Sequence, residues 1–326
     1  MTSGPTALLL GLDIGGTKIG LCIGNAAGDV LAHESIPTDH AKGPESILTD
    51  CRARLLAMLV RAAGDAAVPA AFGASCPGPL DYARGRFLDP PNMPRWHGFP
   101  IRDWLAASFP CPTAFMNDAN ATALAEHKWG AARAATTAVY LTMSTGMGAG
   151  LIIDSRLYEG PLGLAGEIGR IRLRDDGPVG FAKRGSAEGF LSGPGMVQLA
   201  EQEALICIQR GEASRLREIV ESGTKIRAED LCAAAAAGDT AARRVTDRLA
   251  TELGRLCTIL SDILNPDVIV LGTIGTAFPD LFIPGAKRHM LDEGVAASAA
   301  HARIVPSALA RRGDQSALAI AARLMA

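Results

Sequence analysis

The sequence predicts an α/β protein made of two similar halves, each with a mixed β-sheet covered by helices. Two observations indicate a duplication. Apolar strands flank a glycine turn at residues 10–21, and the same order of strand, small hydroxyl residue, glycines and strand returns at residues 139–153. A third glycine turn, at residues 272–275, follows the apolar run 268–271, which is typical of a buried parallel strand. The two equivalent hairpins indicate a duplicated fold, and three glycine loops at strand ends are hard to explain as coincidental turns.

The first half is expected to contain three adjoining antiparallel strands and then strands separated by helices, an order that gives a mixed sheet. These strands are expected at residues 7–13, 19–24, 29–33, 69–75 and 113–116. One helix is expected over about Pro44–Ala63. Asn117 and Asp118 open a second one, which ends near Gly130.

The second half starts again with hairpins from about residue 137 to 173 and then becomes helical. Its helices are expected at residues 194–210, 213–222, 228–237 and 240–264. Asn265 and Pro266 end the longest of them before the buried strand 268–271. A final helix over residues 315–325 is expected to pack back on the region of the glycine loops.

Composition disfavours several classes of protein. The 326 residues are 48% apolar and 20% charged, and the formal net charge of −2 gives no electrostatic reason to bind nucleic acid or an anionic membrane. No segment approaches the length of a transmembrane helix, and the apolar run before Asp13 lacks the basic region and cleavage site of a signal peptide. Seven scattered cysteines without a Cys-x-x-Cys pair indicate reduced thiols, so we expect a cytoplasmic protein.

The turn Asp13–Lys18 has the composition of an anion site. Gly15 and Gly16 allow backbone N–H groups to face a bound oxyanion, an arrangement that favours phosphate. Asp13 stands beside them, where a phosphate-bound Mg²⁺ needs a carboxylate. Taken alone, this loop could equally be a glycine hairpin without a ligand. Neither a Walker P-loop nor a Gly-x-Gly-x-x-Gly fingerprint occurs, so a nucleotide site here belongs to another architecture.

Eight motifs in a fixed order carry a resemblance to a known family. They are Asp13–Lys18, Cys76–Asp81, Asn92–Pro94, Asn117–Ala121, Ser144–Gly150, Gly163–Gly169, Leu264–Gly272 and Gly313–Asp314. On these motifs the chain resembles, nearly from end to end, the ROK family (repressors, open reading frames and sugar kinases) of the actin/hexokinase superfamily. The resemblance implies the duplicated ribonuclease-H-like fold of actin, hexokinase and the Hsp70 ATPase, with two lobes around a cleft. We expect a small lobe of residues 1–117 and 312–326 and a larger lobe of residues 118–311.

The resemblance also implies an ATP-dependent, Mg²⁺-requiring sugar kinase, most simply a glucokinase that makes glucose 6-phosphate. Asp118 matches the catalytic base, which accepts the proton of the sugar hydroxyl as that hydroxyl attacks the γ-phosphate. The alternative is that Asp118 only caps the following helix. The residues expected to bind the sugar are Asn92, Asn117, Asp118, Glu167, Arg170 and Glu188. The residues expected to bind ATP are Gly15, Gly16, Thr17, Lys18, Thr145, Gly146, Gly272 and Gly275, with Asp13 acting through Mg²⁺.

The chain departs from the family at the zinc motif. Val179, Phe181 and Ser186 stand where many members have three thiolate ligands, and Arg170 stands where they have a histidine. We therefore expect no zinc, and we expect the sugar-binding loop to be held by packing of Val179 and Phe181 instead. Because the family histidine often touches the sugar, Arg170 leaves the identity of the substrate open.

Three other functions stand beside the glucokinase interpretation. The nearest is an N-acetylmannosamine or N-acetylglucosamine kinase, and another is a sugar-binding member without catalysis. A sugar-sensing repressor of the family carries a DNA-reading module before the first glycine loop, and the 12 residues before Asp13 are too few for one. We expect a sugar and ATP as ligands, neither nucleic acid nor membrane as partner, and, from the resemblance alone, a homodimer.

Overall fold

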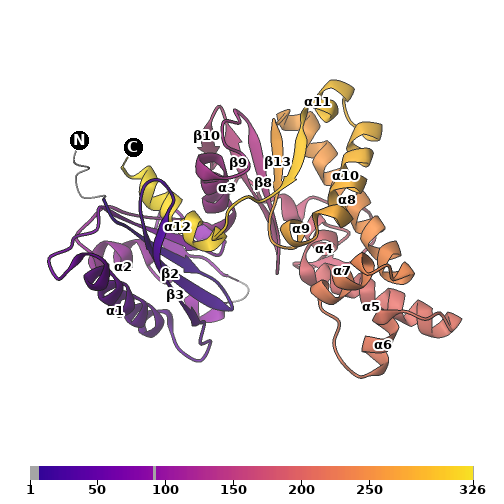
Figure 1. The fold of residues 1–326 in the computed structure, drawn as a ribbon, viewed down its shortest axis with the longest axis horizontal. Coiled ribbons are helices and arrows are strands. Elements are labelled where there is room, and N and C mark those ends of the chain that lie inside the picture. Colours follow the sequence, from indigo (N-terminus) through magenta and orange to yellow (C-terminus); the bar gives the residue numbers. More distant parts are fainter. Residues whose placement is uncertain (1–6, 91–92, 326) are drawn as a thin grey trace. The chain divides into compact units, whose positions relative to one another are not determined.

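The computed structural model describes residues 7–90 and 93–325. The chain divides into two compact units (Figure 1). Unit 1 runs up to Arg133 and includes the segment Leu157–Ala165 and the residues after Ser307. Unit 2 comprises Ala134–Arg156 and Gly166–Ser307. This division places the helix after Asp118 in unit 1, whereas the sequence suggested a boundary just before it. The reason is that this helix packs on strands and on the last helix of unit 1.

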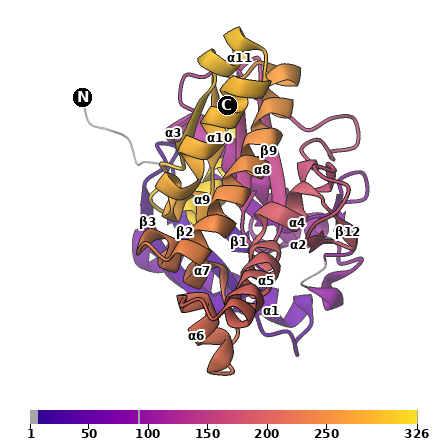
Figure 2. The same ribbon diagram turned by 90° about the vertical axis from the view of Figure 1, so that its right-hand side faces the viewer.

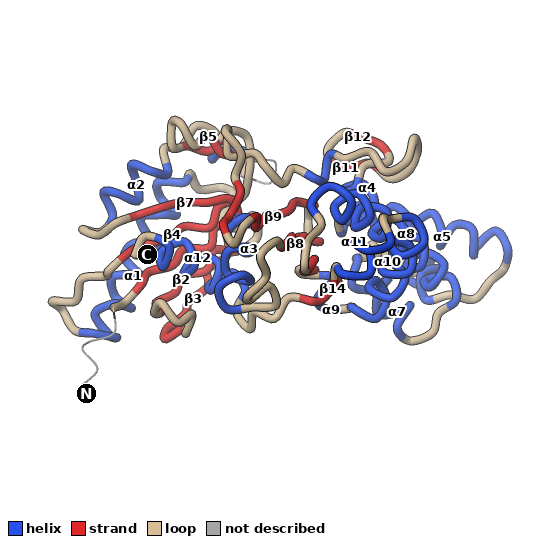
Figure 3. The backbone as a smooth tube through the Cα atoms, turned by 90° about the horizontal axis from the view of Figure 1, so that it is seen from above, coloured by secondary structure: helices blue, strands red, loops and turns tan. Residues whose placement is uncertain are grey.

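Unit 1 is built on a five-stranded mixed sheet in the order β3-β2-β1-β4-β7 (Figure 3). Its strands are β1 (Leu9–Ile14), β2 (Lys18–Gly24), β3 (Val30–Pro37), β4 (Ala71–Cys76) and β7 (Thr113–Asn117). The first three pair antiparallel, and β1, β4 and β7 run parallel. The carboxyl ends of β1, β4 and β7 therefore lie at one edge of the sheet, where ligands of open α/β sheets bind.

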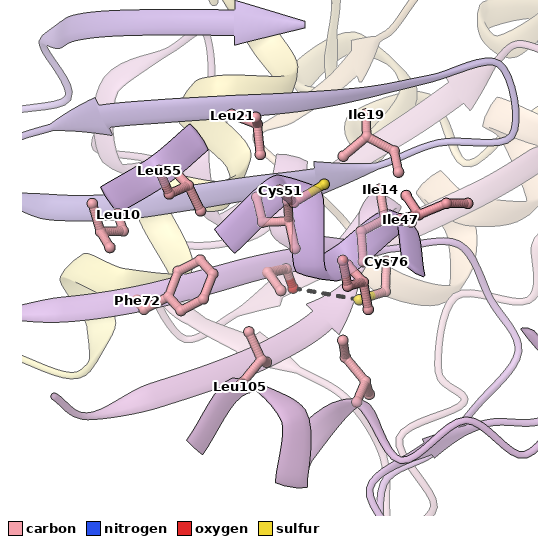
Figure 4. Packing of buried hydrophobic residues seen from close by; sticks show 14 of the residues in the cluster. Leu10, Ile14, Ile19, Leu21, Ile47, Cys51, Leu55, Phe72, Cys76 and Leu105 are labelled. Carbon is pink, nitrogen blue, oxygen red and sulfur yellow. Dashed lines mark hydrogen bonds between the residues drawn. The ribbon is translucent and has the colours of Figure 1, made fainter. Parts of the chain in front are cut away.

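Helices cover both faces of this sheet. The face formed by Leu10, Leu12 and Ile14 packs against α1 (Pro44–Ala63) and α2 (Ile101–Ser108). Figure 4 shows Leu10 and Ile14 in this core. The opposite face packs against α12 (Arg312–Arg323), with α3 (Asp118–Trp129) beside α12. Because successive side chains of a strand point to opposite faces, Asp13 lies on the α12 side of β1.

Glycines allow α12 to lie directly on the sheet. A Cβ atom added at Gly73 of β4 would come within 2.3 Å of the Ala317 carbonyl oxygen. One added at Gly11 of β1 would come within 3.0 Å of the Ala317 Cβ. The backbone of α12 therefore approaches the strands at a distance that any side chain at these positions would prevent.

Unit 1 also contains short elements between β4 and α2. They are β5 (Leu80–Asp81), β6 (Arg86–Phe87) and the 3₁₀ helix η1 (Pro94–Trp96). Phe87, Trp96 and Phe99 contact one another edge to face and join the core under α2.

Unit 2 repeats the sheet arrangement, in the order β10-β9-β8-β13-β14. The strands are β8 (Ala138–Met143), β9 (Met147–Ile153), β10 (Arg156–Tyr158), β13 (Val268–Leu271) and β14 (Arg303–Pro306). The pair β8–β9 is antiparallel, like β1–β2, and β13 runs parallel to β8 and β14. The predicted duplicated α/β fold with two mixed sheets is confirmed.

Helices make up most of the rest of unit 2. They are η2 (Ile168–Arg170), α4 (Ala187–Leu191), α5 (Gly193–Arg210), α6 (Arg215–Glu221), α7 (Ala228–Ala236), α8 (Thr240–Leu264), α9 (Ile274–Ala277), α10 (Pro279–Glu293) and α11 (Ala296–His301). A short hairpin of β11 (Val179–Gly180) and β12 (Lys183–Arg184) precedes α4. Gly254 and Gly285 let α8 and α10 pack closely side by side (Figure 2).

The predicted elements agree with the structure over most of the chain, and the differences have physical causes. The strand expected at residues 29–33 extends to Pro37, because β3 is an edge strand whose half-exposed side chains need not be apolar. The last helix begins at Arg312 rather than at residue 315. Helix α10 was not predicted as an element of its own, since Pro284 and Gly285 interrupt its sequence. Among the described residues, no helix has both the length and the apolar character needed to cross a membrane.

Candidate functional site

The first glycine loop joins β1 to β2 and is held from one side by a threonine. The Gly15 N–H donates to the Lys18 carbonyl at 3.0 Å, which closes the turn. Thr38, just after β3, donates its N–H to the Thr17 carbonyl at 2.9 Å and its hydroxyl to the Gly15 carbonyl at 2.6 Å. These two bonds occupy carbonyls and leave the exposed side chains of Thr17 and Lys18 available to a ligand. Sequence reasoning missed Thr38, which no motif marks.

Asp13 is the last polar side chain of β1 before this loop. Burial raises the pKa of the Asp13 carboxyl, and the nearby Asp314 carboxylate raises it further. Arg312 and Lys18 oppose this effect with their positive charges. Gly313 lies so close that a Cβ atom there would come within 2.1 Å of Asp13 Oδ2. The start of α12 therefore forms one wall around the Asp13 carboxylate.

Asp314, near the start of α12, is paired with two basic side chains. It is only 6% exposed, and it accepts from Arg311 Nε at 2.7 Å and lies 2.9 Å from His33 Nδ1. Asp13 and Asp314 thus place two carboxylates close together at the end of β1. Asp314 is already paired with Arg311 and His33, so Asp13 is the carboxylate left for a cation, and Mg²⁺ needs only one or two carboxylates besides phosphate and water. The residues present therefore fit Mg²⁺ at Asp13.

Asn117 and Asp118 lie at the same edge of the sheet, one strand beyond β4. The Asn117 side chain caps α3, because its Oδ1 accepts from the Ala119 N–H at 3.0 Å. Asp118 is therefore the first residue of the helix rather than its cap, and its Oδ1 accepts from the Ala119 N–H at 2.8 Å. The capping role that the sequence offered as an alternative for Asp118 belongs to Asn117.

Tyr82 supports this junction and was also missed by sequence reasoning. Its hydroxyl oxygen accepts from the Asn117 N–H at 3.0 Å, and its ring stacks on Phe115 of β7 with the ring centroids 5.5 Å apart. Burial raises the pKa of Tyr82 to about 12, so the phenol stays neutral and keeps its proton. Asn92, a predicted sugar-binding residue, lies outside the described residues.

The second glycine loop joins β8 to β9 in unit 2. The Ser144 N–H donates to the Gly146 carbonyl at 3.1 Å, and the side chain of Thr145 is exposed at the tip. The Met147 N–H donates to Glu188 Oε2 at 3.1 Å. One of the predicted sugar-binding glutamates is thus bonded to the backbone of a predicted phosphate loop.

Glu167 directly precedes the short helix η2, and Arg170 is the last residue of that helix. Burial raises the pKa of the Glu167 carboxyl, with a smaller contribution from the Glu188 carboxylate, while the charge of Arg170 lowers it. The Arg170 guanidinium lies over the Phe181 ring, 4.4 Å from its centroid. The structure therefore brings Glu167, Glu188 and Arg170 within electrostatic reach of one another.

The segment that replaces the zinc motif is held differently from our expectation. Val179 is 41% exposed and Phe181 is 52% exposed, so packing of these two side chains does not hold the loop. Instead, the Gln198 side chain accepts from the Val179 N–H at 2.9 Å and donates to the Val179 carbonyl at 2.8 Å. The side chain of Arg172 donates to the Arg184 carbonyl at 3.0 Å. Hydrogen bonds from the Gln198 amide and the Arg172 guanidinium thus hold this segment, in place of the apolar contacts that we expected.

The third glycine loop follows β13, beside β8. The Gly272 N–H donates to the Leu141 carbonyl at 2.8 Å, and the Gly275 N–H donates to the Gly272 carbonyl at 3.0 Å. A Cβ atom at Gly272 would come within 2.1 Å of the Tyr140 hydroxyl oxygen. The loops of unit 2 that carry Thr145, Gly146, Gly272 and Gly275 therefore follow two adjacent parallel strands.

Metal-binding groups were sought across residues 7–90 and 93–325. No cluster of three or more His, Cys, Asp and Glu side chains there is suited to hold a metal ion. All seven cysteines are free thiols, and six of them are buried.

The sequence pattern of the ROK family matches residues 9–326. The chain belongs to the ROK family. Its family relatives include the glucokinase of Halalkalibacterium halodurans, which is 29% identical over 86% of this chain and 84% of its own length. The xylose repressor of Caldicellulosiruptor bescii is 27% identical over 84% of this chain and 68% of its own. The N-acetylmannosamine kinase of Shigella boydii is 34% identical over 60% of this chain and 65% of its own.

Solved structures of ROK proteins share the fold. A ROK family glucokinase from Streptomyces griseus, solved in complex with glucose and AMPPNP, superposes with a TM-score of 0.78. It is 26% identical in sequence, and the match covers 97% of this chain and 100% of that one. The ROK membership and the two-lobe α/β fold that the sequence implied are confirmed, and the similarity to sugar kinases supports a kinase of this type.

Proposed function

We propose that this ROK protein transfers the γ-phosphoryl group of ATP to a hexose, and that the hexose is glucose, converted to glucose 6-phosphate. The observation that carries the proposal is the position of Asp118. Its carboxylate opens α3 at the edge of the sheet where the Asp13–Lys18 loop also lies, with Asn117 taking over the role of helix cap. The Asp118 carboxylate is thus held in place by the Ala119 N–H, and a general base needs such a fixed position.

In the proposed reaction, Asp118 accepts the proton of the 6-hydroxyl while that oxygen bonds to the γ-phosphorus. The bond between the γ-phosphorus and its bridging oxygen breaks, so that ADP leaves. Mg²⁺ held through Asp13 would neutralise phosphate charge. The Asn117 side-chain amide would donate to a sugar hydroxyl beside the base, since its oxygen is taken up by the cap.

The other predicted site residues keep, in this proposal, the roles that the family resemblance gives them. Gly15, Gly16, Thr17 and Lys18 of unit 1 would bind phosphate with their backbone and side-chain donors. Thr145 and Gly146 of unit 2 would do the same, with Gly272 and Gly275 against the nucleoside. Glu167, Glu188 and Arg170 would bind sugar hydroxyls. Asn92 would do so as well, a role that rests on the family resemblance.

An N-acetylhexosamine kinase is the second candidate. The similarity to an N-acetylmannosamine kinase favours it, together with Arg170, whose guanidinium offers donors where many family members have a histidine. An N-acetylglucosamine kinase or a sugar-binding member without catalysis would be the remaining outcomes. The homodimer and the cytoplasmic location also stay proposals, and sedimentation of the purified protein would test the first of them.

Replacing Asp118 by Asn tests the proposed base. A coupled assay of ADP release would first screen glucose, mannose, fructose, allose and both N-acetylhexosamines with the unmodified protein. We expect Asp118→Asn to lower kcat for the best sugar by about 10³-fold. Asp103→Asn, which removes a carboxylate from the first turn of α2, should leave kcat unchanged. If the unmodified protein phosphorylates a sugar and the Asp118→Asn variant does so with the same kcat, the role of Asp118 as the base is refuted.

A further inference from the structure

The second glycine loop, Ser144–Met147, is fastened at both ends by one short segment of unit 2. At one end the Met147 N–H donates to Glu188 Oε2 at 3.1 Å. At the other end the Ser144 carbonyl accepts from the Gly193 N–H at 2.7 Å. Glu188 lies in α4 and Gly193 begins α5, five residues later, so this segment spans the loop from end to end.

The contacts around these two bonds leave little space. A Cβ atom at Gly146 would come within 3.0 Å of Glu188 Oε2, and one at Gly193 within 3.3 Å of the Ser144 carbonyl oxygen. A Cβ atom at Gly169, beside Glu167, would come within 2.2 Å of the Met147 carbonyl oxygen. The backbone of the loop is therefore in direct contact with both elements that carry the sugar-binding glutamates.

The segment itself is firmly anchored. Ser186 caps α4 by accepting from the Gly189 N–H at 3.1 Å, and the Ser192 N–H donates to the Glu188 carbonyl at 3.1 Å. A Cβ atom at Gly195 would come within 1.8 Å of the Gly189 carbonyl oxygen. Since α4 is held by these contacts, the position of the Glu188 carboxylate determines where the Met147 N–H points.

We propose that Glu188 is a positioning residue for the nucleotide loop, and that through it sugar binding and nucleotide binding reinforce each other within unit 2. Oε2 holds the Met147 N–H, and Oε1 is the oxygen offered to a sugar hydroxyl. A sugar that fixes the carboxylate therefore fixes the loop for phosphate, and by linkage a nucleotide that orders the loop raises the affinity for the sugar. The coupling rests on the proposed sugar kinase function, whereas the positioning of the loop can be measured without a sugar.

The first measurement uses Mg²⁺–AMPPNP alone and titration calorimetry on the full chain. Glu188→Ala removes the acceptor for the Met147 N–H, and we expect it to weaken AMPPNP binding about 10-fold. Glu188→Gln keeps a side-chain oxygen at the same distance, so it should restore most of that affinity. Glu201→Ala is the matched control, because it removes an exposed glutamate of α5 that has no assigned role, and AMPPNP affinity should stay within twofold.

The second measurement titrates the best sugar from the kinase screen with and without saturating Mg²⁺–AMPPNP. We expect AMPPNP to raise sugar affinity at least fivefold both in the unmodified protein and in Glu201→Ala. In Glu188→Ala this factor should fall to about one. Thermal melting of each variant checks that it is folded.

The outcomes separate the two proposals. If the unmodified protein binds neither AMPPNP nor a sugar, the proposed kinase function fails. If both ligands bind but Glu188→Ala leaves AMPPNP affinity and the coupling factor unchanged, the positioning role of Glu188 is refuted while the kinase function stands. Equal losses of AMPPNP affinity in Glu188→Ala and Glu201→Ala would refute it as well, because they would indicate a general effect of lost charge.

Discussion

The Asp13 carboxylate combines a proposed role in Mg²⁺ binding with an environment that opposes its charge. Burial and the neighbouring Asp314 raise its pKa, so the folded state is less stable with Asp13 ionised than it would be with a neutral side chain there. A bound Mg²⁺ would relieve this opposition. Activity and stability therefore place opposite demands on this residue.

We expect Asp13→Asn to raise the melting temperature of the ligand-free protein at pH 7 and to abolish Mg²⁺–AMPPNP binding. Each kcal/mol gained would correspond to about 2–4 °C. Because folding raises the pKa of Asp13, its destabilising effect is fully present above the folded pKa and disappears as the pH falls towards the unfolded value of 3.8. The difference in melting temperature between the two proteins should therefore shrink as the pH is lowered from 7 to 4, as scanning calorimetry can check. A constant difference would contradict this explanation.

At the scale of elements, the β11–β12 hairpin shows how the chain manages without zinc ligands in this segment. Phe181 and Ala182 form its two-residue turn with φ angles of 45° and 60°, a left-handed conformation that favours glycine or asparagine. The Phe181 ring lies under the Arg170 guanidinium, and this cation–π contact offsets the backbone strain at Phe181. Ala182 has no such contact to offset its backbone strain.

Ala182→Gly should therefore stabilise the protein by about 1 kcal/mol, because glycine adopts this conformation without strain. Gly185→Ala is the opposite test in the same segment. Its φ is 64°, and its new Cβ would come within 2.1 Å of the Arg174 carbonyl oxygen. It should destabilise the protein by more than 1 kcal/mol. Urea unfolding of both variants would measure this, and a destabilising Ala182→Gly would show that the turn is not strained.

At the scale of the whole molecule, the stability of this protein should not depend on zinc. A structural zinc site contributes folding free energy, so a chelator unfolds or loosens proteins that have one. In this chain Arg170, Val179, Phe181 and Ser186 occupy the four family ligand positions, and side-chain hydrogen bonds from Gln198 and Arg172 hold the segment.

We expect EDTA to leave the melting temperature of the ligand-free protein unchanged, and elemental analysis to find far less than one zinc per chain. Adding Mg²⁺ and AMPPNP should raise the melting temperature by mass action, and EDTA should reverse that increase. One bound zinc per chain would overturn the expectation and would call for ligands other than the four family positions.

Much of the architecture could be predicted from the sequence, because strong local signals repeat. The glycine loops, the helical spacing of apolar residues along α8 and the helix end at Asn265–Pro266 predicted elements close to those observed. Thr38, Tyr82 and Gln198 could not be found in this way. Each acts through a backbone group that is distant in sequence, and nothing about an isolated threonine, tyrosine or glutamine marks such a partner. The bond between Glu188 and Met147 was hidden for the same reason.

Helix α12 packs directly on the sheet of unit 1, although it is the last helix of the chain to be synthesised. Leu318, Ala321 and Ala322 of α12 form one core with Leu9, Cys22 and Ala71. The ribosome synthesises residues 134–307, which include all of unit 2, before it synthesises α12. The apolar face of the unit 1 sheet that α12 covers therefore lacks this helix until all of unit 2 has been synthesised. During translation we expect unit 2 to fold first, and the face around Gly11 and Gly73 to be where a chaperone would bind the nascent chain.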